Sequence, residues 1–146
     1  MASTTPLPPL SPRYPSLVYE HHPDLGDYVY SPSIDLWTNR RVTSEGQEIL
    51  LAGRSRRPSE EQARLWGSIE ARLQALVAKA VAAIQAPPDM PRGSRFSREE
   101  LSLSEVRMES GGVVEFFFDT PLGDELDMWP MATFLDFDLQ GWEWVA

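Results

Sequence analysis

Apolar and polar positions alternate along much of the first third of the chain, as they do in β-strands that bury one face. The alternation predicts strands at residues 28–30, 34–42 and 47–52. Turn-forming residues interrupt it at 31–32 and 44–46, where hairpin connections are expected. We therefore expect three strands before the first helix.

The longest helical signal follows, because apolar residues recur at the three- and four-residue spacing of one helix face. They are Trp66, Ile69, Leu73, Leu76, Ala80 and Ile84. Ser59 and Gln62 have the spacing of a capping box at the start, and the prolines at 87–88 mark the end. The pattern predicts one amphipathic helix of about 26 residues, which spans roughly 40 Å.

Alternation returns after residue 100. Strands are expected at 101–109 and 113–119 around a tight turn at 110–112, because its two glycines tolerate the positive φ of such turns. Two more are expected at 133–138 and 142–145, flanking a turn at residues 139–141 and preceded by a loop at residues 120–124. The whole pattern predicts an α+β fold of order β-β-β-α-β-β-β-β, in which an antiparallel sheet packs on one long helix.

A length of 146 residues fits one domain with one core. Six of the thirteen prolines lie in residues 1–23, which predicts a Pro-rich flexible arm before a single domain at 24–146. The absence of cysteine excludes disulfides, thiol catalysis and cysteine zinc sites, and is typical of a reducing compartment. Without a signal sequence or a long apolar run, a cytoplasmic protein with no membrane span is expected.

The charge is unevenly distributed. Residues 108–146 hold nine acids and no Lys or Arg, whereas acids and bases balance in residues 1–107, so the net charge of −9 belongs to the C-terminal quarter. Such a surface repels nucleic acid. The expected partner is a basic protein or a cation.

Candidate catalytic groups are few. Asp136 and Asp138 would share a face in a strand, and with Asp124 or Asp127 they form the alternative hypothesis of a metal-dependent enzyme. His21 and its neighbour His22 accompany no nucleophile motif, and phosphate-binding and dinucleotide fingerprints are absent. We therefore predict no catalytic residue, no cofactor and no metal site.

The alternation also assigns faces to the C-terminal strands. It directs toward the helix Val114, Phe116, Phe118, Leu135, Phe137, Trp142 and Trp144. The outward side mixes carboxylates with phenylalanines, as a charge-steered protein interface does. The predicted partner-binding residues are Glu115, Phe117, Asp119, Phe134, Asp136, Asp138 and Glu143. In the alternative interpretation, the arm or an outer loop covers Phe117 and Phe134.

The segments 35–37, 59–84 and 113–145 resemble small bacterial α+β domains, among them immunity proteins that neutralise polymorphic or contractile-system toxins. The resemblance lies in pattern and composition, and it transfers no catalytic residue. It implies a non-enzymatic, cytosolic, immunity- or antitoxin-like inhibitor that binds a basic toxin. A structural or adaptor subunit of a bacterial assembly, which would bind through the Pro-rich arm, is a third hypothesis.

Overall fold

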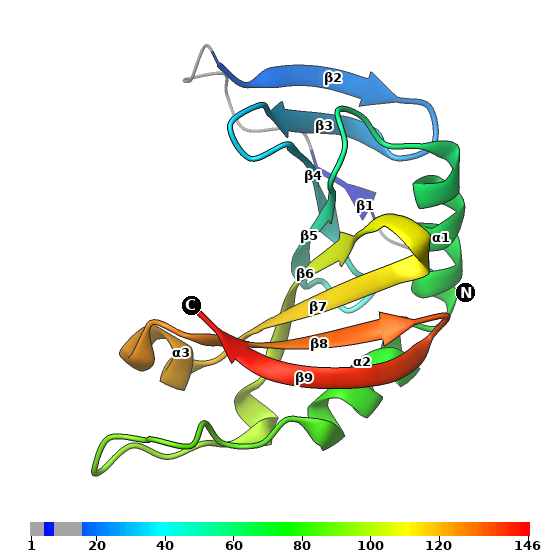
Figure 1. Ribbon diagram of the computed structural model, residues 1–146. Helices are drawn as coiled ribbons and strands as arrows, with labels where there is room; N and C mark the ends of the chain where they lie inside the picture. The colour runs from blue at the N-terminus through cyan, green and yellow to red at the C-terminus, as the bar shows by residue number, and fades with distance from the viewer. Residues whose placement is uncertain (1–4, 8–15) are drawn as a thin grey trace.

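The computed structural model describes residues 5–7 and 16–146. The first half of its sheet is an antiparallel meander of four successive strands, with one short strand added beside it (Figure 1). The strands are β1 (Thr5–Pro6), β2 (Val18–His22), β3 (Gly26–Ser31), β4 (Leu36–Val42) and β5 (Glu48–Gly53). β1 pairs with the end of β4, beyond the part that β3 covers. The three predicted strands before the helix are thus confirmed as β3, β4 and β5.

The sheet begins earlier in the chain than expected, because Val18–His22 pairs along its whole length with β3. These residues fall within the segment predicted to be an arm. Their sequence gives little strand signal, since two histidines and a glutamate accompany only Val18 and Tyr19. The rest of the predicted arm, at residues 1–4 and 8–15, lies outside the described residues.

The expectation of one long helix is wrong, because the segment forms two helices, α1 (Glu60–Ala71) and α2 (Leu73–Ala83). The capping box is confirmed: the Gln62 backbone N–H donates to Ser59 Oγ at 3.0 Å, and the Ser59 N–H donates to Gln62 Oε1 at 2.9 Å. Arg72 breaks the helix with φ −117° and ψ 10°, and its guanidinium lies 4.3 Å from the centre of the Phe137 ring. The break in the helix therefore coincides with a contact between Arg72 and the distant Phe137. The spacing of apolar residues in residues 66–84 does not indicate it.

The two helices connect β5 to the strand β6 (Ser102–Met108), through a last short turn η1 (Arg98–Glu100). Because the chain crosses over the sheet between them, β5 and β6 run parallel, with Leu51 opposite Val106. The sheet is therefore mixed, and the expectation of a purely antiparallel sheet is wrong at this one pair. The α+β class is confirmed.

The second half is another antiparallel meander, and its first hairpin is as predicted. β6 is joined to β7 (Val113–Asp119) by the tight turn η2 (Ser110–Gly112), where Gly111 and Gly112 have φ of 72° and 79°. The expected loop at 120–124 instead begins a short helix, α3 (Pro121–Leu126), with proline in its first turn.

The last hairpin differs from the prediction. β8 (Trp129–Leu135) ends earlier than expected, and β9 (Asp138–Val145) begins after a two-residue turn. Asp136 and Phe137 form this turn with φ of 49° and 66°. Positive φ at both positions of a two-residue turn is typical of Asn-Gly rather than Asp-Phe. The glycine at 141 lies beside a bulge in β9 instead of in a turn.

The changed turn reverses the faces of β8, since a shift of one residue sends every side chain to the opposite side. Phe134, predicted to face a partner, is only 2% exposed and lies with its ring centre 5.0 Å from that of Phe116. Leu135, predicted to face the helix, is 39% exposed. Phe137 does pack against the core, but from the turn rather than from a strand.

The core lies between the helices and one face of the sheet. It includes Trp66 and Ile69 of α1, Leu76 and Ala80 of α2, and the inward residues Val106, Phe116 and Phe118. Trp142 packs against it, and Trp144 Nε1 donates to the carbonyl of Gln85 at 2.9 Å, so both face the helices as predicted. Figure 1 shows α1 and α2 on one side of the curved sheet, with the opposite side facing outward.

Candidate partner-binding surface

Strand register assigns each side chain to one of the two faces. Opposite one another on adjacent strands lie Leu51, Val106, Phe116 and Ala132, all fully buried toward the helices. Because neighbours along a strand point to opposite sides, the residues flanking this row face away from the helices. We call this second surface the open face.

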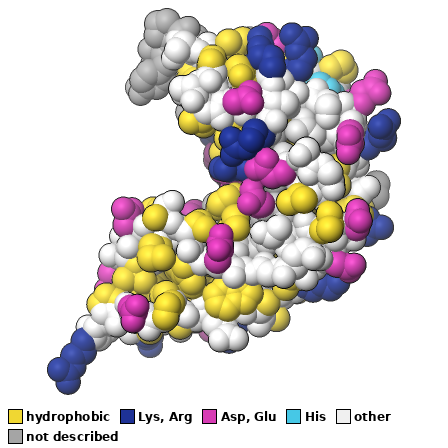
Figure 2. Space-filling model, in the orientation of Figure 1, with side chains coloured by type: hydrophobic (Ala, Val, Ile, Leu, Met, Phe, Trp, Pro, Cys, Tyr) yellow, Lys and Arg dark blue, Asp and Glu magenta, His cyan; other side chains and the backbone are white. Residues whose placement is uncertain are grey.

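Two cross-strand rows form the centre of the open face. The first contains Arg40, Leu50, Glu105, Phe117, Met131 and Glu143. The second contains Thr38, Ala52, Arg107, Glu115, Thr133 and Gly141. Figure 2 shows that the molecule is hollowed on this side, between the part formed by β2 and β3 and the part formed by β8, β9 and α3.

The arginines of the open face are held by neighbouring carboxylates. Arg107 lies 2.7 Å from Glu105 Oε2, and its guanidinium is 4.8 Å from the centre of the Phe117 ring. Arg40 of the first row pairs with Glu48 at 2.9 Å, and Arg54, just after β5, pairs with Glu109 at 3.4 Å. Because these ion pairs neutralise the arginines, the remaining carboxylates determine the charge that the open face presents to a partner.

Glu115 is a carboxylate of this face whose surroundings raise its pKa. Burial is the largest cause that raises the pKa of its side chain, followed by a hydrogen bond to Glu109 and the charge of Glu109. Arg107 and Arg54 act in the opposite direction but do not offset these effects. A cationic group from a partner would therefore approach two carboxyl groups, Glu115 and Glu109, whose mutual repulsion the neighbouring arginines do not fully offset.

Five of the seven predicted partner-binding residues share the open face. Glu115 and Phe117 lie in its central rows, Glu143 lies on β9, and Asp119 continues the same side of β7. Asp138 lies beside Leu135 at the start of β9. The other two do not belong: Phe134 packs in the core, and Asp136 occupies the turn.

Sequence reasoning missed the arginines and Met131. Charged and apolar residues alternate in Glu105-Val106-Arg107-Met108. This pattern alone predicts that Glu105 and Arg107 lie on the outer side of β6. Pairing of β6 with β7, however, brings Arg107 from outside the acidic C-terminal quarter into the middle of the face. The predicted patch of one sign is thus a mixed patch in which carboxylates outnumber arginines.

The acids of the alternative metal site do not come together. Asp124 and Asp127 precede β8, whereas Asp136 follows it, so a whole strand of about 20 Å separates them. Among residues 5–7 and 16–146, no group of three or more histidines, aspartates or glutamates has a geometry that could hold a metal ion.

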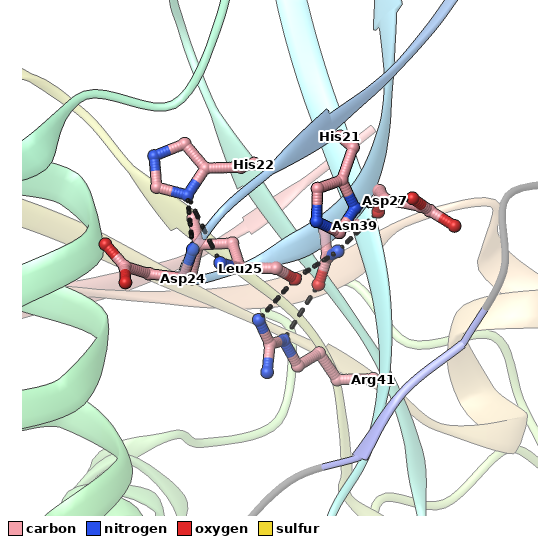
Figure 3. Close-up of polar contacts among 7 residues, drawn as sticks. All are labelled: His21, His22, Asp24, Leu25, Asp27, Asn39 and Arg41. Carbon is pink, nitrogen blue, oxygen red and sulfur yellow. Dashed lines mark hydrogen bonds and ion pairs between the residues drawn. The ribbon is translucent and has the colours of Figure 1, made fainter.

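The two histidines take part in a polar cluster that anchors the β2–β3 hairpin (Figure 3). His22 Nδ1 accepts the backbone N–H groups of Asp24 and Leu25, at 3.1 and 3.2 Å, while His21 pairs with Asp27 at the surface. Below them, the carbonyl of Leu25 accepts from Asn39 and from Arg41 at 2.9 and 2.7 Å.

Arg41 is 6% exposed, and burial lowers the pKa of its guanidinium. Its contacts with the Leu25 carbonyl and with Asn39 Oδ1 fix the hairpin on β4. These arrangements are structural, since each histidine is used to hold local backbone or a neighbouring strand residue.

Comparison with known proteins supplies no relative: no family model matches the chain, and no curated protein or solved structure is significantly similar to it. Within the described part of the chain, none of the helices has the length and apolar character needed to cross a membrane. The candidate surface therefore rests on geometry and charge.

Proposed function

We propose that the protein is a non-catalytic binding domain, an immunity- or antitoxin-like inhibitor that holds a basic protein against the open face. The observation that carries this proposal is the composition of that face. Phe117, which is partly exposed, forms the apolar centre beside the buried Met131, Glu115 and Glu143 lie around it, and the arginines already have carboxylate partners. An apolar centre with a charged surround is the usual anatomy of a specific interface.

Charge and apolar contacts have separate expected roles. The carboxylates accelerate encounter with a basic partner and lose that effect as salt screens them. Phe117, once covered, slows dissociation, since affinity depends on a few desolvated anchors. The hollow of the sheet is suited to a convex surface or an extended segment of the partner (Figure 2).

The test begins with crosslinking in the native host, followed by purification of the captured protein and surface plasmon resonance at two salt concentrations. The double variant Asp138→Lys, Glu143→Lys should slow association about tenfold or more at low salt. Phe117→Ala should raise the dissociation rate by a similar factor. Co-expression should also relieve any toxicity of the captured protein.

Glu61→Lys is the matched control, because Glu61 is exposed on α1, on the opposite side of the sheet. It should change association much less than the open-face variants. The proposal fails if this control has an equal effect, or if hydrogen exchange in the complex protects α1 and leaves β7 and β8 unprotected.

A further inference from the structure

The strand β9 forms one margin of the sheet (Figure 1). In the part of the chain that the structure describes, the backbone of β9 pairs with β8 alone, and no other segment forms a backbone hydrogen bond with it. About half of the N–H and C=O groups of an antiparallel edge strand point away from its neighbour. Such a row of unpaired groups is a template on which another extended segment can add as a strand.

A bulge confines the regular part of this edge to Gly141–Val145. The register of β8 with β9 shifts between Thr133 and Phe134, which leaves Gln140 as the extra residue of β9. The side-chain amide of Gln140 donates to the Asp138 carbonyl at 3.1 Å, so the backbone before the bulge is already engaged. A pairing segment therefore meets residues 141–145, at the C-terminal end of the strand.

The segment Gly141–Val145 alternates in chemistry as well as in direction. Trp142 and Trp144 face the helices, while Glu143 lies between them, is exposed and points to the open face. On the same side as Glu143, a β-carbon at Gly141 would meet no atom within 4 Å, which leaves space for a long side chain of a partner. A strand beside this one would therefore place apolar side chains against the indoles and its other side chains near Glu143.

The two indoles are already positioned for such a contact. Both are partly exposed, although Trp142 packs against the core. Trp144 Nε1 donates to the carbonyl of Gln85, and the centre of the Trp144 ring lies 6.0 Å from that of Phe96 in an edge-on contact. A side chain that is fixed beforehand loses little conformational freedom on binding, and tryptophan is enriched among the residues that dominate affinity at interfaces.

The opposite margin of the sheet, β2, is less suited to pairing. It is a shorter strand of five residues. The Glu20 side chain accepts from Tyr28 and from Arg56, and His21 pairs with Asp27. These side chains of β2 are thus engaged within the protein, whereas Glu143 of β9 remains available to a partner.

We propose that β9 receives an extended segment of the basic partner, which pairs with Gly141–Val145 as an additional strand and alternates apolar with basic residues. Its apolar residues cover Trp142 and Trp144, and a lysine or arginine lies opposite Glu143. A second copy of this chain fits less well, because residues 108–146 hold nine acids and no Lys or Arg, and like charges on neighbouring strands repel. The inference rests on the proposed function, since it names the segment by which the partner continues from the open face.

The probe is the peptide acetyl-Lys-Val-Lys-Val-Lys-Val-Lys-amide, titrated into the ¹⁵N-labelled protein while amide and indole N–H resonances are followed. One control peptide has the same composition in the order Lys-Lys-Val-Val-Val-Lys-Lys, which removes the alternation. The other carries N-methyl groups on its three central residues, which keep the charge but remove backbone donors from both edges. The alternating peptide should shift the amide resonances of Gly141–Val145 and bind about fivefold more tightly than either control.

The variant Glu143→Lys tests the charged side of the pairing strand. It should weaken the alternating peptide about fivefold and strengthen its counterpart with glutamate in place of lysine by a similar factor. Glu61→Lys is the matched control, because it makes the same change in net charge at an exposed position of α1. Its affinity for both peptides should stay within about twofold of the wild type.

Equal binding of the alternating and the N-methylated peptides overturns the inference, as do equal effects of the two variants or shifts that avoid residues 141–145. Concentration-dependent shifts of these residues in the protein alone, with a doubled mass, assign the edge to a second copy and overturn it too. If a captured basic protein protects β7 and β8 from hydrogen exchange but leaves β9 unchanged, only the edge inference is wrong. If the peptide binds at β9 and no basic partner covers the open face, the proposed function is wrong instead.

Discussion

The indole of Trp37 occupies the space that a side chain at residue 53 would need. The two residues lie opposite each other on β4 and β5, and a β-carbon on Gly53 would lie 2.5 Å from Cε2 and Nε1 of the ring. Trp37 is fully buried, and its Nε1 donates to Gln62 Oε1 at 3.2 Å, so the ring also connects the sheet to the start of α1. Its position therefore depends on the absence of a side chain.

Gly53→Ala should lower the free energy of unfolding by about 1–3 kcal/mol, the usual cost of adding a methyl group to a well-packed core. Denaturation in urea measures this change. Gly67→Ala is the matched control, because Gly67 is exposed on α1 with open space around it. The control should raise stability by up to about 1 kcal/mol, since alanine favours helix. Equal effects at the two sites would show that Trp37 moves aside freely.

The raised pKa of Glu115 makes the free energy of unfolding depend on pH. Because its pKa is higher in the folded protein than the ordinary value of 4.5, the folded state holds more protons than the unfolded state in the range above that value. The contribution of Glu115 to the free energy of unfolding is therefore present below that range and is lost as pH rises through the folded-state pKa.

Glu115→Gln abolishes this titration, so its stability relative to the wild type should increase between about pH 4 and pH 7. Urea denaturation across that range gives the comparison. Glu143→Gln removes a carboxylate from an exposed position of the same face and serves as the control for lost charge. A constant difference between Glu115→Gln and the wild type would contradict the assigned environment.

Individual inward residues were predictable wherever a strand keeps regular alternation. Val114, Phe116 and Phe118 are buried as expected, because β7 runs without a bulge from the glycine turn to Asp119. Phe134 was not, since its face depends on where the β8–β9 turn lies. Asp136 and Phe137 adopt positive φ without the glycine that normally signals such a turn.

At the scale of elements, the helix pair shows what spacing does and does not encode. The apolar stripe predicts the buried positions of both helices, and the capping box predicts the start of α1. The break at Arg72 was not predictable, because neither glycine nor proline marks it. Its guanidinium instead lies over Phe137, which only the folded sheet brings near.

Packing of α2 on the sheet gives a matched pair of substitutions. Leu76 is 4% exposed, whereas Leu73 on the same helix is half-buried. Leu76→Ala should cost about 2–5 kcal/mol of stability, the range for truncated core leucines. Leu73→Ala should cost roughly half as much or less, since it removes less apolar surface from the core. Thermal or urea denaturation compares them, and a reversed order would place the wrong face of α2 against the sheet.

For the whole molecule, the sequence predicted the class of fold and most of the acidic members of the candidate site. It did not predict the shape of the site, because that shape depends on how two meanders are joined. The parallel pairing of β5 with β6 brings Leu50 beside Glu105 and Ala52 beside Arg107. No local pattern encodes that pairing, since the two strands are separated by both helices and the loop that follows them.

The same parallel pair determines what the chain exposes while it is being synthesised. When β5 leaves the ribosome, its partner β6 still lies about 50 residues away, which at ordinary elongation rates corresponds to roughly 2–10 s. During that interval the backbone N–H and C=O groups along Ile49, Leu51 and Ala52 have no neighbouring strand on that side. Such an apolar edge is a site for self-association. Early formation of α1 and α2, or binding of a chaperone, should therefore be needed to keep the nascent chain from aggregating until β6 has been synthesised.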